Sequence, residues 1–138
     1  MEKIQTIIIG GGQAGLSTSY YLCQMGHEHL ILEQASQAAN AWRNDRWDSF
    51  TLLTPNWSIK LPGTIYRGND PDGFMTRAEI VSLFEKYIDN FDLPVQYDTS
   101  VTEVTQLENE EGYLVKTSHK IYQARNVVMA TGQFQKGK

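Results

Sequence analysis

The chain begins with a short, uninterrupted apolar stretch. Lys3 to Ile9 ends in three consecutive isoleucines and shows no polar alternation, which is typical of a strand buried on both faces of a parallel sheet. Glu28 to Glu33, "EHLILE", has the same compact apolar character. The pattern therefore predicts two neighbouring parallel strands near the N-terminus.

A helical repeat separates these two strands. From Gln13 to Met25 the larger apolar side chains recur at helical spacing, and Gly26 follows at the position of a left-handed helix end. Residues 3 to 33 thus run strand, loop, helix, strand, in about the minimum length for a βαβ unit. This order predicts an α/β fold with a parallel sheet.

The second half of the chain carries a different pattern. The turn residues "PDGFM" at 71–75 precede a second amphipathic stretch, which predicts a helix to about Asn90. Short strand-like pieces follow at Leu93 to Tyr97, Ser100 to Leu107, Gly112 to Thr117 and Lys120 to Ala124. We interpret them as antiparallel hairpins that form a small β-meander. Asn126 to Ala130, "NVVMA", is again nearly all apolar and is expected to return to the parallel sheet.

Composition and charge narrow the class of protein. The 138 residues fit one domain, and 41% of them are hydrophobic, enough for a core. The net charge of -4 comes without blocks of like charge, so neither a nucleic-acid surface nor a polybasic membrane anchor is indicated. The apolar run at Ile7 to Ile9 is too short for a signal peptide or a membrane span.

Cys23 is the only cysteine. An intrachain disulfide, a CxxC redox pair and a cysteine-based zinc site are therefore excluded, and the histidines and carboxylates show no metal-ligand spacing. The absence of CxxC argues against a disulfide reductase of the thioredoxin-reductase kind. A reducing, cytoplasmic location is predicted.

The candidate chemistry lies in the glycine-rich loop after the first strand. Gly10, Gly12 and Gly15 satisfy GxGxxG between a buried strand and a helix, and Glu33 ends the second strand about 20 residues further on. Gly10 permits the tight turn, Gly12 lets the backbone approach a pyrophosphate, and Gly15 allows close packing of helix on sheet. The helix N-terminus attracts phosphate, and Glu33 would accept hydrogen bonds from the adenosine ribose and repel a 2′-phosphate. The sequence therefore predicts a Rossmann-like dinucleotide-binding domain.

An irregular segment separates this unit from the second helix. The stretch "AWRNDRWDSFTLLTPNWSIKLPG" holds all three tryptophans, Trp42, Trp47 and Trp57. Long irregular segments line binding sites, but aromatic residues also fill cores, and the pattern leaves both interpretations open. A nicotinamide-binding domain would continue with further strand–helix repeats, so the order of elements favours FAD.

These motifs together resemble a known family. "IIGGGQAGLSTSYYL", "ILE", "WRNDRWDSFTLLTPNW", "LPG", "DGFMTRAE" and "VVMATGQF" are similar to the N-terminal FAD-binding part of the flavin-containing monooxygenase-like flavoproteins. This group includes the CzcO-like proteins of the two-dinucleotide-binding-domain superfamily. The resemblance covers residues 4 to about 135. It implies a flavoprotein oxidoreductase in which NADPH reduces FAD before oxygen is activated and transferred to a small-molecule substrate.

The resemblance also implies which residues contact the cofactor. Trp42 and Arg43 match a tryptophan–arginine pair beside the cofactor, Val101 matches a position whose backbone meets the adenine, and the "ATG" segment lies near the flavin site. Residues 54–56 sit where relatives place side chains against the flavin. The full predicted set of FAD contacts is Gly10, Gly12, Gln13, Ala14, Gly15, Glu33, Gln34, Trp42, Arg43, Asn56, Val101, Ala130, Thr131 and Gly132.

The chain departs from the family pattern after "ATG". Relatives continue into a second GxGxxG domain that binds NADPH, and no second motif of this kind is present in the sequence. We therefore expect residues 1–138 to be the FAD-binding domain, an N-terminal fragment without the NADPH-binding domain. Two alternatives stay open: a non-enzymatic dinucleotide-binding module or truncated remnant, and an NAD-binding dehydrogenase domain, which the meander and "ATG" disfavour.

Overall fold

A computed structural model describes residues 2–36, 77–108 and 110–131 of the chain. The described elements are, in chain order, β1 (Glu2–Ile9), α1 (Gln13–Gln24), β2 (His29–Leu32), α3 (Arg77–Phe91), β3 (Val95–Gln96), β4 (Val101–Gln106), β5 (Tyr113–Thr117) and β6 (Ile121–Met129).

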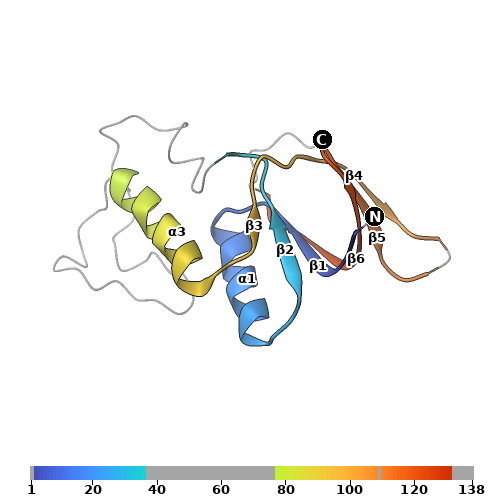
Figure 1. The fold of residues 1–138 in the computed structure, drawn as a ribbon, viewed down its shortest axis with the longest axis horizontal. Coiled ribbons are helices and arrows are strands. Elements are labelled where there is room, and N and C mark those ends of the chain that lie inside the picture. Colours follow the sequence, from blue (N-terminus) through green and yellow to red (C-terminus); the bar gives the residue numbers. More distant parts are fainter. Residues whose placement is uncertain (1, 37–76, 109, 132–138) are drawn as a thin grey trace.

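All six described strands belong to one sheet, in the order β3-β2-β1-β6-β5-β4. Strands β3, β2, β1 and β6 run parallel to one another, whereas β5 pairs antiparallel with both β6 and β4. The sheet therefore has a parallel half and an antiparallel half that share β6 (Figure 1). The predicted α/β fold with a parallel sheet and a small antiparallel meander is confirmed.

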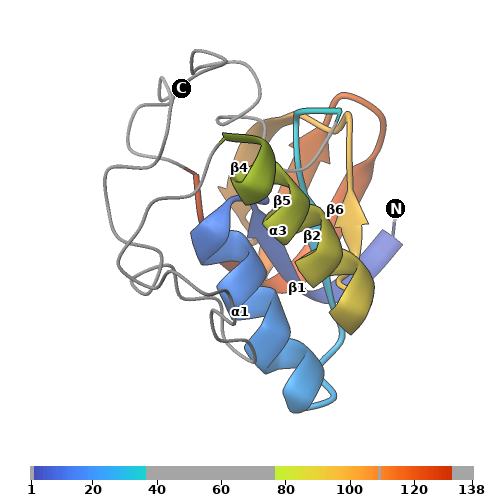
Figure 2. The same ribbon diagram turned by 90° about the vertical axis from the view of Figure 1, so that its left-hand side faces the viewer.

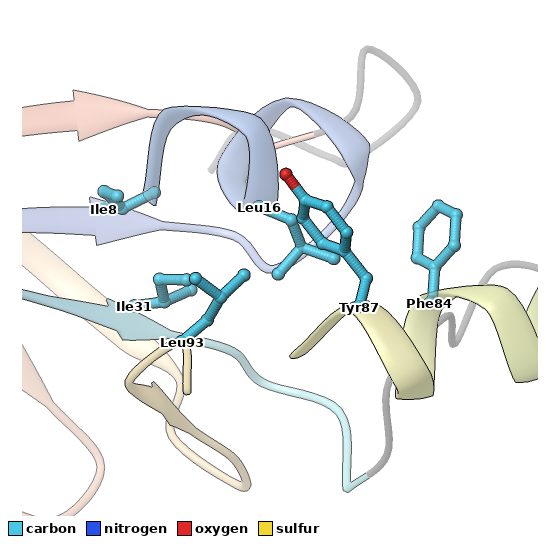
Figure 3. Close-up of a cluster of buried hydrophobic side chains, with 6 residues drawn as sticks. All are labelled: Ile8, Leu16, Ile31, Phe84, Tyr87 and Leu93. Atoms are coloured by element: carbon cyan, nitrogen blue, oxygen red, sulfur yellow. The ribbon is translucent and has the colours of Figure 1, made fainter. Parts of the chain in front are cut away.

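Both helices cover the same face of the sheet (Figure 2). A buried cluster on this face joins side chains from β1, β2, α1, α3 and the segment after α3 (Figure 3). Its buried members are Ile8, Leu16, Ile31, Phe84, Tyr87 and Leu93. Burial, followed by the neighbouring Tyr20 and Tyr21, raises the pKa of the Tyr87 phenol far above its ordinary value.

A second cluster lies on the opposite face of the sheet. It contains Ile7, Ile9, Leu32, Val115, Tyr122 and Ala124. Because successive strand residues point to opposite faces, Ile8 packs under the helices while Ile7 and Ile9 join the second cluster. This explains the unbroken isoleucine run. The prediction of a strand buried on both faces is confirmed for Thr6 to Ile9, whereas Lys3 and Gln5 are exposed.

Helix α1 is fixed at its middle and at its end. The buried His29 ring accepts the Ser19 hydroxyl at Nε2 (2.7 Å), because its Nδ1–H donates to the His27 carbonyl (2.9 Å). At the end of the helix Gly26 adopts a φ of 66°, and the N–H groups of Gly26 and His27 donate to Cys23 and Leu22. This paired hydrogen bonding is a Schellman motif, so the predicted left-handed helix end is confirmed.

Two strand predictions are wrong. The piece from Leu93 to Tyr97 was expected in the hairpins, but β3 pairs parallel with β2 instead. The pieces Lys120 to Ala124 and Asn126 to Ala130 were expected as separate strands, but β6 runs through both without a break. Strand β6 pairs parallel with β1 along one edge and antiparallel with β5 along the other, so one strand serves both halves of the sheet. The error for β3 arises because hydrophobic patterning does not encode which neighbour a strand will find.

Candidate functional site

The glycine loop lies at the carboxyl end of β1, between β2 on one side and β6 on the other. The Gly10 N–H donates to the Leu32 carbonyl (2.9 Å), and the Ala130 N–H donates to the Ile9 carbonyl (2.8 Å). Gly10 has a φ of 110°, and a Cβ there would lie 2.7 Å from the Ala130 carbonyl oxygen. Strand ends at this edge of an open parallel sheet form the crevice where α/β proteins bind ligands.

Gly12 stands open at the N-terminus of α1. A Cβ built on Gly12 meets no atom of the described residues within 4 Å, whereas the Cβ positions of Gly10, Gly11 and Gly15 all do. The first turn of α1 carries no acidic residue of its own, so no side chain of the helix neutralises the positive end of the helix dipole. A phosphate group fits this space, because the first amides of a helix point outward and favour an anion.

Gly15 lets α1 rest directly on the loop that precedes it. A Cβ at this position would lie 2.0 Å from the Gly10 carbonyl oxygen, well inside any permitted contact. Gly15 is buried, and Leu16 beside it enters the cluster under the helices. The close packing expected of the third glycine is therefore confirmed.

Glu33 follows β2 and reaches back across the glycine loop. Its carboxylate accepts the Gly11 N–H at Oε1 (2.7 Å) and the Ala35 N–H at Oε2 (2.8 Å). The backbone of Glu33 is held as well, because its N–H donates to Gln96 (2.9 Å) and its carbonyl accepts from Thr99 (3.0 Å). The carboxylate is half-buried at the edge of the space beside Gly12.

The loop after Glu33 is tied to the segment between β3 and β4. The Ser36 hydroxyl donates to the Asp98 carboxylate, and the Asp98 N–H donates to the Ala35 carbonyl (2.9 Å). Asp98 adopts a φ of 55°, in the left-handed region that Asp tolerates better than most residues. The His119 Nε2–H donates to the Asp98 carbonyl (2.8 Å), which adds the β5–β6 turn to this arrangement.

The structure brings together several of the residues predicted from the sequence. Gly10, Gly12, Gly15, Glu33 and Ala130 surround the end of β1, with the Thr131 N atom 3.2 Å from a Cβ built on Gly10.

Other predicted residues lie near the rim of this site. Gln13 and Ala14 are exposed in the first turn of α1, and Gln34 is exposed directly after Glu33. Val101 begins β4, half-buried against the second cluster and two residues beyond Thr99. Outside the described residues lie Trp42, Arg43, Trp47, Asn56, Trp57 and Gly132, with the rest of the tryptophan-rich segment.

Sequence reasoning missed Gly11 and Ala35. Their amides bind the Glu33 carboxylate, but GxGxxG leaves the position of Gly11 unspecified and Ala35 belongs to no motif. The run of three consecutive glycines was the one available signal, since one more glycine is present than the motif requires.

Neither a metal site nor a membrane-spanning helix is found among the described residues. Within residues 2–36, 77–108 and 110–131, no group of three or more His, Cys, Asp or Glu side chains is placed to hold a metal ion. Neither of the helices in those ranges is long and apolar enough to cross a membrane.

Comparison with known proteins gives one family match and many relatives. The model of a family described as pyridine nucleotide-disulphide oxidoreductase matches residues 7–138. The chain is 40% identical over 129 residues to the uncharacterized oxidoreductase CzcO of Bacillus subtilis, which covers 94% of this chain and 36% of that protein.

Solved structures agree with this match. A flavin-containing monooxygenase from Stenotrophomonas maltophilia superposes with a TM-score of 0.85 at 30% identity, over 96% of this chain and 39% of that one. A steroid monooxygenase solved with NADP has the same fold, with a TM-score of 0.83 at 22% identity over 99% of this chain and 27% of the other. The chain thus spans little more than a third of the length of CzcO and of two further curated relatives that it matches.

Proposed function

Because the chain belongs to the pyridine nucleotide-disulphide oxidoreductase family, we propose that residues 1–138 form the FAD-binding domain of an NADPH-dependent, flavin monooxygenase-like oxidoreductase. The observation that carries the proposal is the open position at Gly12, at the N-terminus of α1 and beside the Glu33 carboxylate. Similarity to the 30% identical flavin-containing monooxygenase supports the choice of a flavin cofactor. Similarity in fold to the steroid monooxygenase solved with NADP supports the choice of a nicotinamide donor.

In this proposal each part of the site holds one part of FAD. The pyrophosphate lies over Gly12 against the first amides of α1, including those of Gln13 and Ala14. Glu33 accepts hydrogen bonds from the adenosine ribose, while Gln34 and the backbone of Val101 lie on the adenine side. Ala130, Thr131 and Gly132, with Trp42, Arg43 and Asn56, serve the flavin side by resemblance to the family.

The chain's own residues bind and orient the cofactor. FAD, when bound, supplies the redox chemistry, and the protein sets its position and its access to water. NADPH and a small-molecule substrate belong to the activity of the whole protein, for which we propose a cytoplasmic location because Cys23 is the only cysteine.

The test compares the unaltered chain with Gly12→Ala. After FAD is added and the excess removed, the unaltered chain should retain bands near roughly 370 and 450 nm, where protein-bound oxidised flavin absorbs. Gly12→Ala should fold normally, because its methyl group meets no atom within 4 Å in the described part of the chain. It should weaken FAD binding at least about tenfold, since the methyl group occupies the phosphate position and the helix-end contact is worth up to ~2 kcal/mol.

Two results would contradict the proposal. A chain that retains no FAD, or a Gly12→Ala variant that binds FAD as tightly as the unaltered chain, would remove FAD from this loop. Steady oxidation of added NADPH by the chain with bound FAD would exclude a non-enzymatic binding module, because the flavin would then accept hydride.

A further inference from the structure

Asp98 joins three segments that lie far apart in the sequence. Its N–H donates to the Ala35 carbonyl (2.9 Å), and its carboxylate accepts the Ser36 hydroxyl. Its carbonyl accepts the Nε2–H of His119 (2.8 Å). Figure 1 shows the chain after β2 passing beside the segment that joins β3 to β4. One residue of this segment therefore binds both the loop after β2 and the β5–β6 turn.

The backbone of Asp98 has an uncommon conformation. Its φ of 55° lies in the left-handed region, which disfavours residues other than glycine, although Asp and Asn tolerate it. Asp92 has a similar φ of 51°, but it directly follows α3, where a left-handed residue is the ordinary end of a helix. Asp98 follows no helix. Strained conformations persist where the surroundings fix them, and they gather at sites that hold ligands.

The β5–β6 turn presents His119 in a defined position. The His119 N–H donates to the Thr117 hydroxyl (3.1 Å), and the Ser118 N–H donates to the Ser100 carbonyl (2.9 Å). The ring of His119 is exposed, so hydrogen bonds rather than packing orient it. The turn therefore contacts the β3–β4 segment at two points, through Ser100 and through the carbonyl of Asp98.

The segments that Asp98 joins lie on two sides of the proposed adenine position. Gln34 directly precedes Ala35, and Val101 begins β4 three residues after Asp98. Both Gln34 and Val101 belong to the adenine side of the proposed site. The bonds of Asp98 fix the two segments relative to each other before a nucleotide binds. Such preorganisation strengthens binding, because less freedom remains to be lost when the ligand arrives.

We propose that Ser36, Asp98 and His119 form a clamp that preorganises the adenine side of the nucleotide site. Ser36 holds the clamp to the loop after β2, and His119 holds it to the β5–β6 turn. The inference rests on the proposed nucleotide site and gives the antiparallel half of the sheet a part in it. The three residues act through the loops that they join, so they are positioning residues.

Substitutions at Asp98 and His119 remove single parts of the clamp. His119→Ala removes one donor and leaves the exposed carbonyl of Asp98 to water, so the chain should still fold. Asp98→Gly keeps the left-handed backbone but loses the carboxylate. Asp98→Asn keeps an oxygen that accepts the Ser36 hydroxyl and tolerates the same φ, so it should restore function.

Lys120→Ala is the matched control. Lys120 belongs to the same turn as His119, but its ammonium group bonds the Glu2 carboxylate (2.9 Å) and makes no printed contact with the clamp. The variant therefore removes a side-chain contact of the turn and leaves the bonds of Asp98 in place.

The experiment measures the affinities for ADP and for inorganic pyrophosphate by NMR titration. His119→Ala and Asp98→Gly should each weaken ADP binding about three- to tenfold, the range expected for one hydrogen bond. Asp98→Asn and Lys120→Ala should stay within about twofold of the unaltered chain. Pyrophosphate binding should stay within about twofold in every variant, because its proposed contacts lie at Gly12 and the first turn of α1.

The outcomes separate this inference from the proposed function. If His119→Ala binds ADP as tightly as Lys120→Ala does, or if Asp98→Asn binds it no better than Asp98→Gly, the clamp is wrong although the nucleotide site stands. Equal weakening of ADP and pyrophosphate would also overturn the clamp, because the effect would then reach the whole site. If the unaltered chain binds neither ADP nor FAD, the proposed function itself fails.

Discussion

The parallel half of the sheet is enclosed, whereas the antiparallel half faces solvent along its outer strand. Thr6 to Ile9 of β1 are all buried, and β2 is nearly so. In β4 every residue from Thr102 to Gln106 is exposed. An enclosed strand cannot shift to accommodate a new atom, because side chains pack against it from both faces. The loops that follow β1 and β2 are attached to these rigid strands. The candidate site is built from those loops.

The largest effect is expected where the enclosed half is closest-packed. Gly15→Ala would place a Cβ 2.0 Å from the Gly10 carbonyl oxygen. Helix α1 must then move away from the loop, and we expect a loss of about 3 kcal/mol in the free energy of unfolding, at the upper end for overpacking. Urea unfolding measures it, with Gly12→Ala as the matched control. Equal unfolding midpoints for the two variants would show that α1 is not seated on the loop.

A smaller effect is expected where the antiparallel half joins the core. Val115 of β5 is fully buried in the second cluster, while Val104 of the neighbouring β4 is 38% exposed. Val115→Ala should lower the free energy of unfolding by about 2 kcal/mol, and Val104→Ala by less than about 0.5 kcal/mol. The same urea titration decides the point. If both substitutions destabilise the chain equally, the contrast between the inner strand β5 and the solvent-facing outer strand β4 is wrong.

The smallest effect is expected on β4, the outer strand that faces solvent. A hydrogen bond from the Thr105 hydroxyl, followed by the charge of Lys116, lowers the pKa of Glu103 below its ordinary value of 4.5. Thr105→Val and Lys116→Ala should therefore each raise this pKa, as followed by NMR titration of the carboxyl carbon. An unchanged pKa in either variant would show that the contact it removes does not act on Glu103.

The sign of the accompanying pH dependence follows from the direction of the shift. Because folding lowers the pKa of Glu103, the ionised carboxylate favours the folded chain above pH 4.5, and this contribution disappears as the pH falls through the lowered pKa. Glu103 is fully exposed, so both variants should leave the unfolding midpoint at pH 7 without measurable change.

The unit of strand, loop, helix and strand that begins the chain was predicted best. An apolar run such as Ile7 to Ile9 has one plausible environment, and a glycine-rich loop between strand and helix has few backbone solutions. The β4–β5 and β5–β6 hairpins were also predicted, whereas the parallel pairing of β3 with β2 was not. The sequence also indicated a break at Arg125, yet β6 passes through it, because β1 continues to pair with β6 where the pairing with β5 has ended.

The candidate site likewise contains residues that the sequence predicted and residues that it did not. The three motif glycines and Glu33 could be placed from spacing alone, because each meets a demand of the backbone or of the loop. Gly11 could not, since the atom it makes room for belongs to a residue 22 positions later. A constraint of this kind is a tertiary contact, and a single sequence does not record which residues meet across a loop.

Strand β1 pairs along its length with β6, and the Asn126 amide reaches the Thr6 hydroxyl across 120 positions of the chain. At synthesis rates of about 5–20 residues per second, the ribosome needs on the order of 6–24 s to make those residues. During that interval the glycine loop lacks Ala130, the residue against which Gly10 turns. Translation therefore leaves the isoleucine-rich edge of β1 that faces β6 without its partner strand for seconds.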